Sequence, residues 1–407
     1  MDELLERVRA MPCGRRLLEA AAGIDGVHLT GGAVRDLLLE REPHELDVVV
    51  EGGGAAVATL AARLGDVDAA HERFGTLTVR AGGCRWDLAA ARAERYAQPG
   101  ALPAVRAARI GHDLLRRDVT VNALALDLRT GELRAVERAR EDLAAGRLRV
   151  LHEASFVDDP TRLWRIARYA ARLGFELEPR TARLAAQAVA AGALQTVSGA
   201  RIGSELRLAL HEPDPLAALE VVTALGLAPW LAPERGRAAA ALDLLPDGEG
   251  RADLIVLGAS LVGPVADTDA LLARLDFTSA ERAVLRACAS ADALTAAAEA
   301  ARRPSDLARV LRGVPVEALA IAGAAGAGAG GAGATAALRR WLGELRFVGL
   351  AITGDDLLAA GVPEGPEIGQ RLAATLDRLL DGELEPGRDA QLSAALQVMP
   401  RGDRRRG

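Results

Sequence analysis

Lysine is absent from this chain: all 50 of its basic residues are arginine. This excludes enzymes whose chemistry needs a lysine, such as P-loop nucleotide hydrolases, protein kinases and Schiff-base enzymes. Aromatic residues are also scarce, at 3% of 407 residues, whereas hydrophobic residues make up 50%. The core must therefore consist mainly of Leu, Ala and Val, which favours a largely helical protein.

Cysteine is rare as well. Cys13, Cys84 and Cys288 lie far apart in the sequence, so we expect neither a zinc cluster nor a disulfide among them. A reducing compartment, the cytoplasm, fits this usage best. The first ten residues carry acids and arginines without an apolar segment, which argues against a secretory signal.

Long hydrophobic runs are missing too. The one long uncharged stretch, from Ala318 to Leu338, is rich in glycine and poor in large aliphatic residues, so we interpret it as an Ala/Gly linker and expect no membrane association. The net charge is −6, but residues 101–200 hold more arginines than acids. If the chain binds a polyanion, this segment is the expected surface; a solvated helical surface explains the same charge.

The first 150 residues alternate short β-like runs with helical stretches, and from about Ser155 the pattern is helical almost throughout. A helix over 159–173 is predicted from its apolar residues at Leu163, Ile166, Ala170 and Leu173. We therefore expect an α+β multidomain protein: an N-terminal α/β head with a small mixed sheet, then an all-helical neck, body and tail. The expected strands are Val27 to Leu29, Leu46 to Val50, Thr76 to Arg80 and Cys84 to Ala89.

The expected domains follow from these changes in pattern. They are a catalytic head (residues 1–150), a neck (151–212), a body (213–320), an Ala/Gly-rich linker (321–337) and a tail (338–407).

The first candidate site is a glycine pair in Gly31-Gly32-Ala33-Val34-Arg35-Asp36, placed between a short strand and a helix. Glycines let the backbone approach an anion closely, and a helix start offers free N–H groups to phosphate oxygens. A tight turn between strand and helix explains the glycines equally.

The second candidate site is a set of acids on strands. Glu45 and Asp47 lie two residues apart at the start of a β-branched run, so their side chains are expected on one face. Asp87, in another strand-like run, could join them. Paired carboxylates repel one another unless a cation lies between them, which suggests a divalent-metal site; a solvated strand end is the alternative.

The order of these elements resembles the class II nucleotidyltransferase family, which comprises tRNA CCA-adding enzymes and bacterial poly(A) polymerases. Further matches follow in the family's order, and together they cover about 180 of the 407 residues. They are Phe74-Gly75-Thr76, Arg116-Arg117-Asp118-Val119-Thr120-Val121-Asn122-Ala123, Asp158-Asp159-Pro160-Thr161-Arg162, and Ser198 to Glu205 with Arg201 inside it. The chain departs from the family at Glu45, where an Asp is usual.

The resemblance implies roles for individual residues. Asp159 and Arg162 would read the edge of the incoming base, because an acceptor beside several donors can pair with cytosine or with adenine; a surface ion pair is the alternative. The catalytic acids would be Glu45, Asp47 and Asp87, with Glu45 and Asp47 holding Mg²⁺. The expected nucleotide-binding residues are Gly31, Gly32, Arg35, Asp36, Arg117, Asp159, Arg162, Arg165 and Arg168, the last two bound to phosphate or bracing the helix.

The resemblance also implies the reaction: addition of C and A residues to the tRNA 3′ end from CTP and ATP, with release of pyrophosphate. A poly(A) polymerase, an enzyme that adds only CC or only A, and a catalytically impaired RNA-binding homologue remain alternatives. The implied partners are the acceptor arm of tRNA, CTP and ATP, and no obligate protein partner is inferred. No His-Asp phosphohydrolase pattern occurs among the six histidines, so a second hydrolase domain is not expected.

Overall fold

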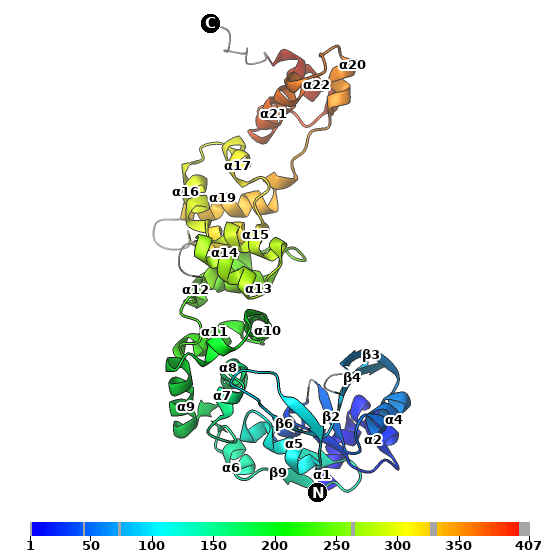
Figure 1. The fold of residues 1–407 in the computed structure, drawn as a ribbon. Coiled ribbons are helices and arrows are strands. Elements are labelled where there is room, and N and C mark those ends of the chain that lie inside the picture. The colour runs from blue at the N-terminus through cyan, green and yellow to red at the C-terminus, as the bar shows by residue number, and fades with distance from the viewer. Residues whose placement is uncertain (1, 44, 72–74, 262–264, 326–331, 399–407) are drawn as a thin grey trace. The chain divides into compact units, whose positions relative to one another are not determined.

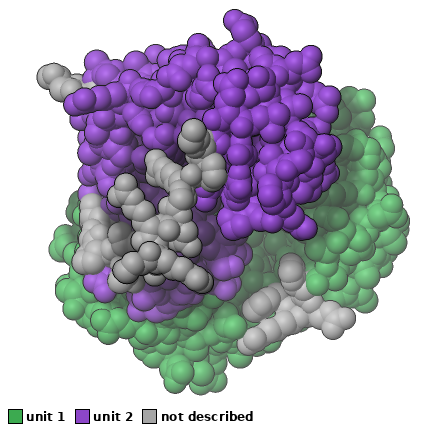
Figure 2. All heavy atoms as spheres, turned by 90° about the horizontal axis from the view of Figure 1, so that it is seen from above, with its two compact units in different colours: residues 1–229 green, residues 230–407 purple. Residues whose placement is uncertain are grey.

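The computed structural model describes residues 2–43, 45–71, 75–261, 265–325 and 332–398. The chain divides into two compact units, residues 1–229 and 230–407, which Figure 2 colours green and purple. Every named strand belongs to the first unit, and the second is built from helices (Figure 1). The predicted fold class, a mixed-sheet head followed by helices, is confirmed.

The first unit begins with helices that alternate with strands and ends with helices alone (Figure 1). Its helices are α1 (Asp2–Ala10), α2 (Pro12–Ala21), α3 (Gly32–Leu38), α4 (Gly54–Leu64), α5 (Ile110–Leu115), α6 (Ala139–Ala144), α7 (Ser155–Asp158), α8 (Thr161–Leu173), α9 (Pro179–Ala190), α10 (Gly199–Leu210) and α11 (Pro215–Ala224), with short 3₁₀ turns η2 (Thr120–Asn122) and η3 (Ala193–Thr196). Its strands are β1 (Val27–Thr30), β2 (Leu46–Val50), β3 (Asp66–His71), β4 (Thr76–Ala81), β5 (Cys84–Ala90), β6 (Arg92–Arg95), β7 (Ala104–Ala107), β8 (Leu124–Asp127), β9 (Leu133–Ala135), β10 (Arg147–Leu148) and β11 (Glu176–Leu177).

Seven strands form the central sheet in the order β3-β4-β5-β2-β1-β8-β9. Strands β2 and β5 run parallel, and the other neighbours run antiparallel. All four strands expected from the sequence are present. Strand β8 was missed, because its fully buried Leu-Ala-Leu-Asp run lacks the alternation that marks a half-exposed strand.

The two faces of the sheet have different chemistry because successive side chains on a strand point to opposite sides. Leu46, Val48 and Val50 of β2 enter the main core together with residues of α2, α3 and α4. Trp86 and Leu88 of β5 enter the same core. The residues between them, which include Asp47 and Asp87, therefore lie on the opposite face.

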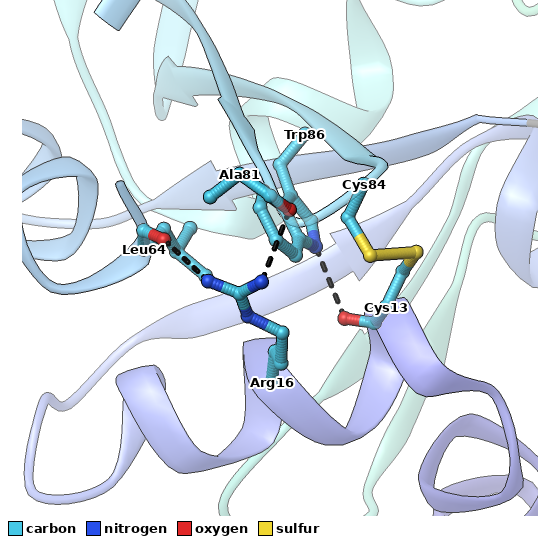
Figure 3. Close-up of a disulfide and its surroundings, with 6 residues drawn as sticks. All are labelled: Cys13, Arg16, Leu64, Ala81, Cys84 and Trp86. Atoms are coloured by element: carbon cyan, nitrogen blue, oxygen red, sulfur yellow. Dashed lines mark hydrogen bonds between the residues drawn. A yellow bond between two sulfur atoms is a disulfide. The ribbon is translucent and has the colours of Figure 1, made fainter. Parts of the chain in front are cut away.

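A disulfide ties α2 to this sheet, where none was expected: Cys13 bonds to Cys84 at the start of β5 (Figure 3). The sequence prediction was wrong because 71 residues separate the two cysteines, and only the packing of α2 against β5 brings their Cα atoms to 5.4 Å. Trp86 also donates a hydrogen bond to the Cys13 carbonyl, and Arg16 donates to the carbonyls of Ala81 and Leu64.

Helix α8 is the central helix of the neck. It begins at Thr161, two residues later than predicted, since Asp159 has extended backbone angles and precedes the helix. The four apolar residues that predicted the helix are all buried. Gly174 ends the helix with a left-handed conformation, φ +69°.

The second unit consists of helices α12 (Arg235–Leu244), α13 (Ala252–Ser260), α14 (Val265–Arg274), α15 (Ser279–Cys288), α16 (Ala291–Ala300), α17 (Pro304–Leu311), α18 (Val316–Ala325), α19 (Ala332–Gly343), α20 (Gly354–Ala359), α21 (Pro366–Leu380) and α22 (Arg388–Gln397), with a 3₁₀ turn η4 (Leu345–Phe347). No helix in the described part of the chain is both long and apolar enough to cross a membrane.

Helices occupy both ends of the segment expected to be an Ala/Gly linker, residues 321–337. Residues 321–325 lie in α18, residues 332–337 lie in α19, and only 326–331 fall outside the described residues. The small side chains serve helix packing: a Cβ added at Gly323 would lie 2.7 Å from a methyl group of Leu244, and Thr335 donates a hydrogen bond to the Gly323 carbonyl at 2.7 Å. Phe74, which belongs to one of the sequence motifs, also lies outside the described residues.

Candidate active site

A cleft of about 650 Å³ opens within the first unit, on the face of the sheet opposite the core that contains α2, α3 and α4. Side chains reach it from the strands, from the turn after α5 and from α8. Of the predicted site residues, Gly31, Gly32, Asp47, Asp87, Arg117, Asp159, Arg162 and Arg165 line it. The fold therefore brings together groups that are up to 134 residues apart in the sequence, from Gly31 to Arg165.

Asp47 and Asp87 are the acidic pair of the cleft. They are direct partners in the parallel register of β2 and β5, so their carboxylates point to the same face from adjacent strands. Burial raises the pKa of Asp47 to about 6; Arg117 opposes this shift, whereas Glu45 and Asp87 add to it. Asp87 accepts a hydrogen bond from Thr78 at 2.5 Å and lies 2.9 Å from Arg85. A positive charge between Asp47 and Asp87 would relieve this unfavourable concentration of anions.

Glu45 does not share the cleft. It lies in a bend before β2, its side chain is 62% exposed, and the nearest cationic group is Arg85 Nη1 at 3.8 Å. Glu45 directly precedes β2, which begins at Leu46 as expected, and its charge still acts on Asp47. The structure adds Asp87 as the cross-strand partner of Asp47. No group of three or more His, Cys, Asp or Glu side chains is arranged for a metal ion within the residues the structure describes.

Gly31 is required at its position. Its φ is +68°, and a Cβ there would lie 2.6 Å from Arg117 Nη1 and 3.8 Å from Asp47 Oδ2. The missing side chain thus allows an arginine and a carboxylate to approach the turn between β1 and α3.

Arg35 and Asp36, from the same motif, are not among the residues that line the cleft. Arg35 is buried and donates to Asn122 Oδ1 at 2.7 Å and to Asp36 Oδ1 at 2.8 Å. It therefore braces α3 against the η2 turn. The nucleotide-binding role expected for Arg35 and Asp36 stays a prediction, and the geometry found here gives them a structural one.

Arg117 reaches the cleft beside Asp47. It donates to Asp113 Oδ2 at 3.2 Å and to the Asn122 carbonyl at 3.3 Å. Its Nε is buried without a hydrogen-bond partner among the described residues. A buried guanidinium N–H without a partner is costly, so this group favours an anionic or carbonyl ligand.

Asp118 organises the side of the cleft next to α8. It is buried and accepts hydrogen bonds from Arg165 and from the Tyr169 hydroxyl, both at 2.9 Å. Burial alone would raise its pKa, but the charge of Arg165 and the Tyr169 hydrogen bond hold the pKa of Asp118 well below its usual range. Asp118 therefore stays ionised and fixes Arg165 in the wall of the cleft.

Asp159 and Arg162 both line the cleft, but they do not pair with each other. Arg201 of α10 binds Asp159 Oδ1 at 2.8 Å, and that oxygen also accepts from Thr161 at the start of α8. Arg162 donates to Ser155 Oγ and to the Arg116 carbonyl, each at 2.8 Å. The alternative expectation of an intrahelical Asp159–Arg162 ion pair is therefore wrong, because Asp159 lies before the helix.

Arg168 faces away from the cleft, as its angular position on the helix predicts. It donates to Glu205 and Glu212, both at 2.9 Å, and so joins α8 to α10 and to the residues that follow α10. Its role is to brace the neck.

Several residues of the cleft were not selected from the sequence: Glu94, Tyr96, Arg116, Asp118, Asn122, Tyr169 and Arg201. Four of them, Arg116, Asp118, Asn122 and Arg201, lie inside motifs quoted from the sequence. Their position in those motifs could have identified them as site residues. Glu94, Tyr96 and Tyr169 had no such signal.

Known proteins resemble this chain in sequence. Residues 27–149 match the family model described as the poly A polymerase head domain. An A-adding tRNA nucleotidyltransferase of Geobacter sulfurreducens is 34% identical, over 91% of this chain and 45% of that protein. A CC-adding tRNA nucleotidyltransferase of Deinococcus radiodurans is 43% identical, over 49% of this chain and 53% of that protein. The chain spans about half, or less, of the length of the curated relatives it matches.

Solved structures resemble nearly the whole chain. A CCA-adding enzyme in its apo form has a TM-score of 0.80 and 28% identity, covering 97% of this chain and 96% of that one. The Thermotoga maritima CCA-adding enzyme complexed with tRNA has a TM-score of 0.74 and 27% identity, covering 97% of both chains.

Proposed function

The chain belongs to the nucleotidyltransferase family of tRNA CCA-adding enzymes and bacterial poly(A) polymerases, and from this premise we propose that it adds C and A residues to the 3′ end of tRNA. The single observation that carries the proposal is the cleft itself. It combines a cross-strand pair of carboxylates, Asp47 and Asp87, with an acceptor and a donor, Asp159 and Arg162, that suit a base edge.

In the proposed reaction the 3′-hydroxyl of tRNA attacks the α-phosphate of CTP or ATP, and pyrophosphate leaves. No nucleic-acid template is needed, because the protein reads the base. Asp159 is suited to accept from an exocyclic amino group, since no described residue donates to its Oδ2. Arg162 is held by hydrogen bonds to Ser155 Oγ and the Arg116 carbonyl, and its Nη1 lies 3.4 Å from His152 Nε2. Its remaining N–H groups can donate to a ring nitrogen or a carbonyl.

The triphosphate would lie between the glycine turn and the arginines. Gly31 and Gly32 line the cleft, and the guanidinium of Arg117, whose Nη1 lies beside Gly31, adds a positive charge next to them. Arg165, fixed by Asp118, adds a second positive charge in the same wall. These groups would orient the nucleotide so that its α-phosphate lies near the carboxylates.

The residues present fit Mg²⁺, the metal that the family implies. Magnesium is commonly bound by one or two carboxylates together with substrate phosphates, and Asp47 and Asp87 offer such a pair on one face. Burial, together with the charges of Glu45 and Asp87, raises the pKa of Asp47, and a bound cation would counter that shift. When bound, the metal would supply positive charge to the phosphates and the attacking oxygen. Glu45, which is more exposed, would add negative charge beside this pair.

The helical neck and body would bind the acceptor arm of tRNA, mainly through phosphates and shape rather than sequence. One related structure, the Thermotoga maritima enzyme, is described as a complex with tRNA. We expect the protein to act on tRNA. The cytoplasm stays the expected compartment, but the Cys13–Cys84 disulfide removes the argument from cysteine usage.

A second candidate is addition of A alone. It is favoured by the Geobacter sulfurreducens relative, which aligns over 91% of this chain and is named an A-adding enzyme. A CC-adding enzyme and a poly(A) polymerase would each give a different product, and an impaired homologue would give none.

The test is product length. The purified chain is incubated with Mg²⁺ and either tRNA that lacks CCA or tRNA that ends in CC, with CTP alone, ATP alone or both. Full CCA addition gives three added residues on the first substrate with both nucleotides. An A-adding enzyme extends only the CC-ending tRNA, by one residue, and long A tails identify a poly(A) polymerase. No extension on any substrate would contradict the proposal.

A further inference from the structure

Tyr96 lies on the cleft wall beside the base-reading arginine, and neither the sequence motifs nor the proposed reaction uses it. It follows β6, and its ring centroid lies 6.0 Å from the guanidinium carbon of Arg162. Both side chains line the cleft. A guanidinium over an aromatic face at this distance is attracted to it and is restricted in orientation.

A closed series of contacts joins the two residues a second time. The Tyr96 hydroxyl donates to Glu94 Oε2 at 3.0 Å. The other oxygen of Glu94 accepts from Arg116 Nη1 at 3.1 Å, and the Arg116 carbonyl accepts from Arg162 Nη2 at 2.8 Å. The ring of Tyr96 and the carbonyl of Arg116 therefore both contact Arg162, and Glu94 binds the Tyr96 hydroxyl and the Arg116 guanidinium.

The hydroxyl is not suited to acid–base chemistry. Burial raises the pKa of Tyr96 to about 12, with Arg162 opposing and Glu94 adding to the shift. The hydroxyl therefore remains a neutral donor to Glu94, and the part of Tyr96 that faces Arg162 is its ring.

We propose that Tyr96 is a positioning residue that holds the guanidinium of Arg162 in the orientation from which it reads the base, and so sets how strongly the site distinguishes nucleotides. This inference rests on the proposed function, since it assigns Arg162 to the base. It predicts a division of labour: Asp159 is positioned by Arg201 from α10, and Arg162 is positioned by Tyr96 from the strand β6 side.

The test compares Tyr96→Leu, which removes the ring, with Tyr96→Phe, which keeps it. Phe347→Leu is the matched control, because Phe347 is 66% exposed and belongs to the second unit. For each variant, kcat and KM are measured for CTP, ATP, UTP and GTP with tRNA. Dissociation constants for the same nucleotides are measured without tRNA by equilibrium dialysis.

We expect Tyr96→Leu to reduce the ratio between the preferred and the rejected nucleotides by about two- to thirty-fold, in KM and in the dissociation constants. Tyr96→Phe and Phe347→Leu should keep the wild-type ratios. A merely structural role would lower the melting temperature or kcat for all nucleotides together, so unchanged ratios in Tyr96→Leu would overturn the proposal.

Two further outcomes are decided in advance. If Tyr96→Leu does not fold, Tyr96→Met, whose flexible side chain fills the same space, is judged by the same ratios. If wild type binds nucleotides selectively but incorporates none, the proposed reaction fails, while the binding ratios still decide the role of Tyr96. If wild type binds all four nucleotides equally, Tyr96 has no selection to support and the inference is wrong.

Discussion

At the scale of single residues, the candidate site depends on polar groups that strand alternation places opposite the core. Asp47 lies between two buried residues of β2, and Asp87 lies between two buried residues of β5. The same two-residue period that buries the apolar side chains exposes the carboxylates to the cleft. Substitutions at these positions should therefore change chemistry more than stability.

The first prediction concerns Asp47. Asp47→Ala should lower incorporation by orders of magnitude, because it removes one of two carboxylates suited to the metal, while the melting temperature stays near that of wild type. Asp25→Ala is the control, since Asp25 is 90% exposed. Steady-state incorporation of labelled CTP or ATP measures the effect, and near-normal turnover would refute the metal assignment. Glu45→Asp, which restores the residue usual in the family, should retain or raise activity.

The second prediction concerns base selection. Asp159→Ala removes an acceptor and leaves Arg201 without its carboxylate, at about 1–3 kcal/mol for each lost buried bond. It should therefore relax the choice among CTP, ATP, UTP and GTP, with a smaller loss of rate than Asp47→Ala. The measurement is kcat/KM for the four nucleotides. Asp292→Ala, which breaks an exposed ion pair with Arg237 in the second unit, should leave the preference order unchanged.

The third prediction concerns pH and His28, a buried histidine of β1 on the edge of the core. Burial lowers the pKa of His28. The charges of Asp127 and Glu51 oppose this shift; Arg134 adds to it more weakly, and Glu132 opposes it more weakly. The unfolded chain then binds a proton below about pH 6.5 that the folded chain does not, so stability is lost as the pH falls through that value.

His28→Leu should therefore flatten the dependence of unfolding free energy on pH between 5 and 7, by at most about 1.4 kcal/mol per pH unit. Urea denaturation at several pH values measures the slope. His112→Leu, at an exposed position, is the control. An identical slope in wild type and His28→Leu would show that His28 takes up its proton at the same pH in the folded and the unfolded chain.

At the scale of elements, the site is held by links between segments that are distant in the chain. Arg168 joins α8 to Glu205 and Glu212, and Arg201 joins α10 to Asp159. On the other side of the sheet the Cys13–Cys84 disulfide joins α2 to β5, the strand that presents Asp87 three residues later (Figure 3). Each link fixes an element that carries a cleft residue.

The fourth prediction follows from the disulfide. It closes a loop of 71 residues, for which the chain-entropy relation gives about 4 kcal/mol of stabilisation. Reduction by dithiothreitol should therefore lower the melting temperature of the first unit. The double variant Cys13→Ser/Cys84→Ser should melt at the temperature of the reduced protein and should not respond to dithiothreitol. An unchanged melting temperature on reduction would show that the bond does not contribute.

At the scale of the whole molecule, the two units have separate expected tasks. All residues that line the cleft lie between Thr30 and Arg201, inside the first unit. That unit also contains the sheet and its core. Nucleotide selection should therefore belong to residues 1–229, and tRNA affinity should depend on both units.

The fifth prediction tests this division. A fragment of residues 1–229 should fold, bind CTP or ATP with dissociation constants within a few-fold of the full chain, and show a much higher KM for tRNA. Circular dichroism, equilibrium dialysis and steady-state kinetics provide the three readouts. Loss of nucleotide binding in a folded fragment would mean that residues after 229 complete the site.

Much of the head could be predicted from the sequence because its signals are local. Strand β2 begins at Leu46 and ends at Val50, as its β-branched run predicted. Helix α8 buries the apolar residues whose spacing predicted a helix. Gly31 and Gly32 lie at the turn that their position between strand and helix suggested. The ordered motifs also identified the family, since they depend on residue type and spacing alone.

Only the tertiary structure decided which side chains meet. The sequence places Glu45 near Asp47, whereas only the parallel register of β2 and β5 shows that Asp87 is the direct cross-strand neighbour of Asp47. Asp159 has Arg201 rather than Arg162 as its ion-pair partner, and Cys13 bonds to Cys84 across 71 residues. Local patterns report the period of a strand or helix, whereas these contacts depend on how separate elements pack, which no single segment encodes.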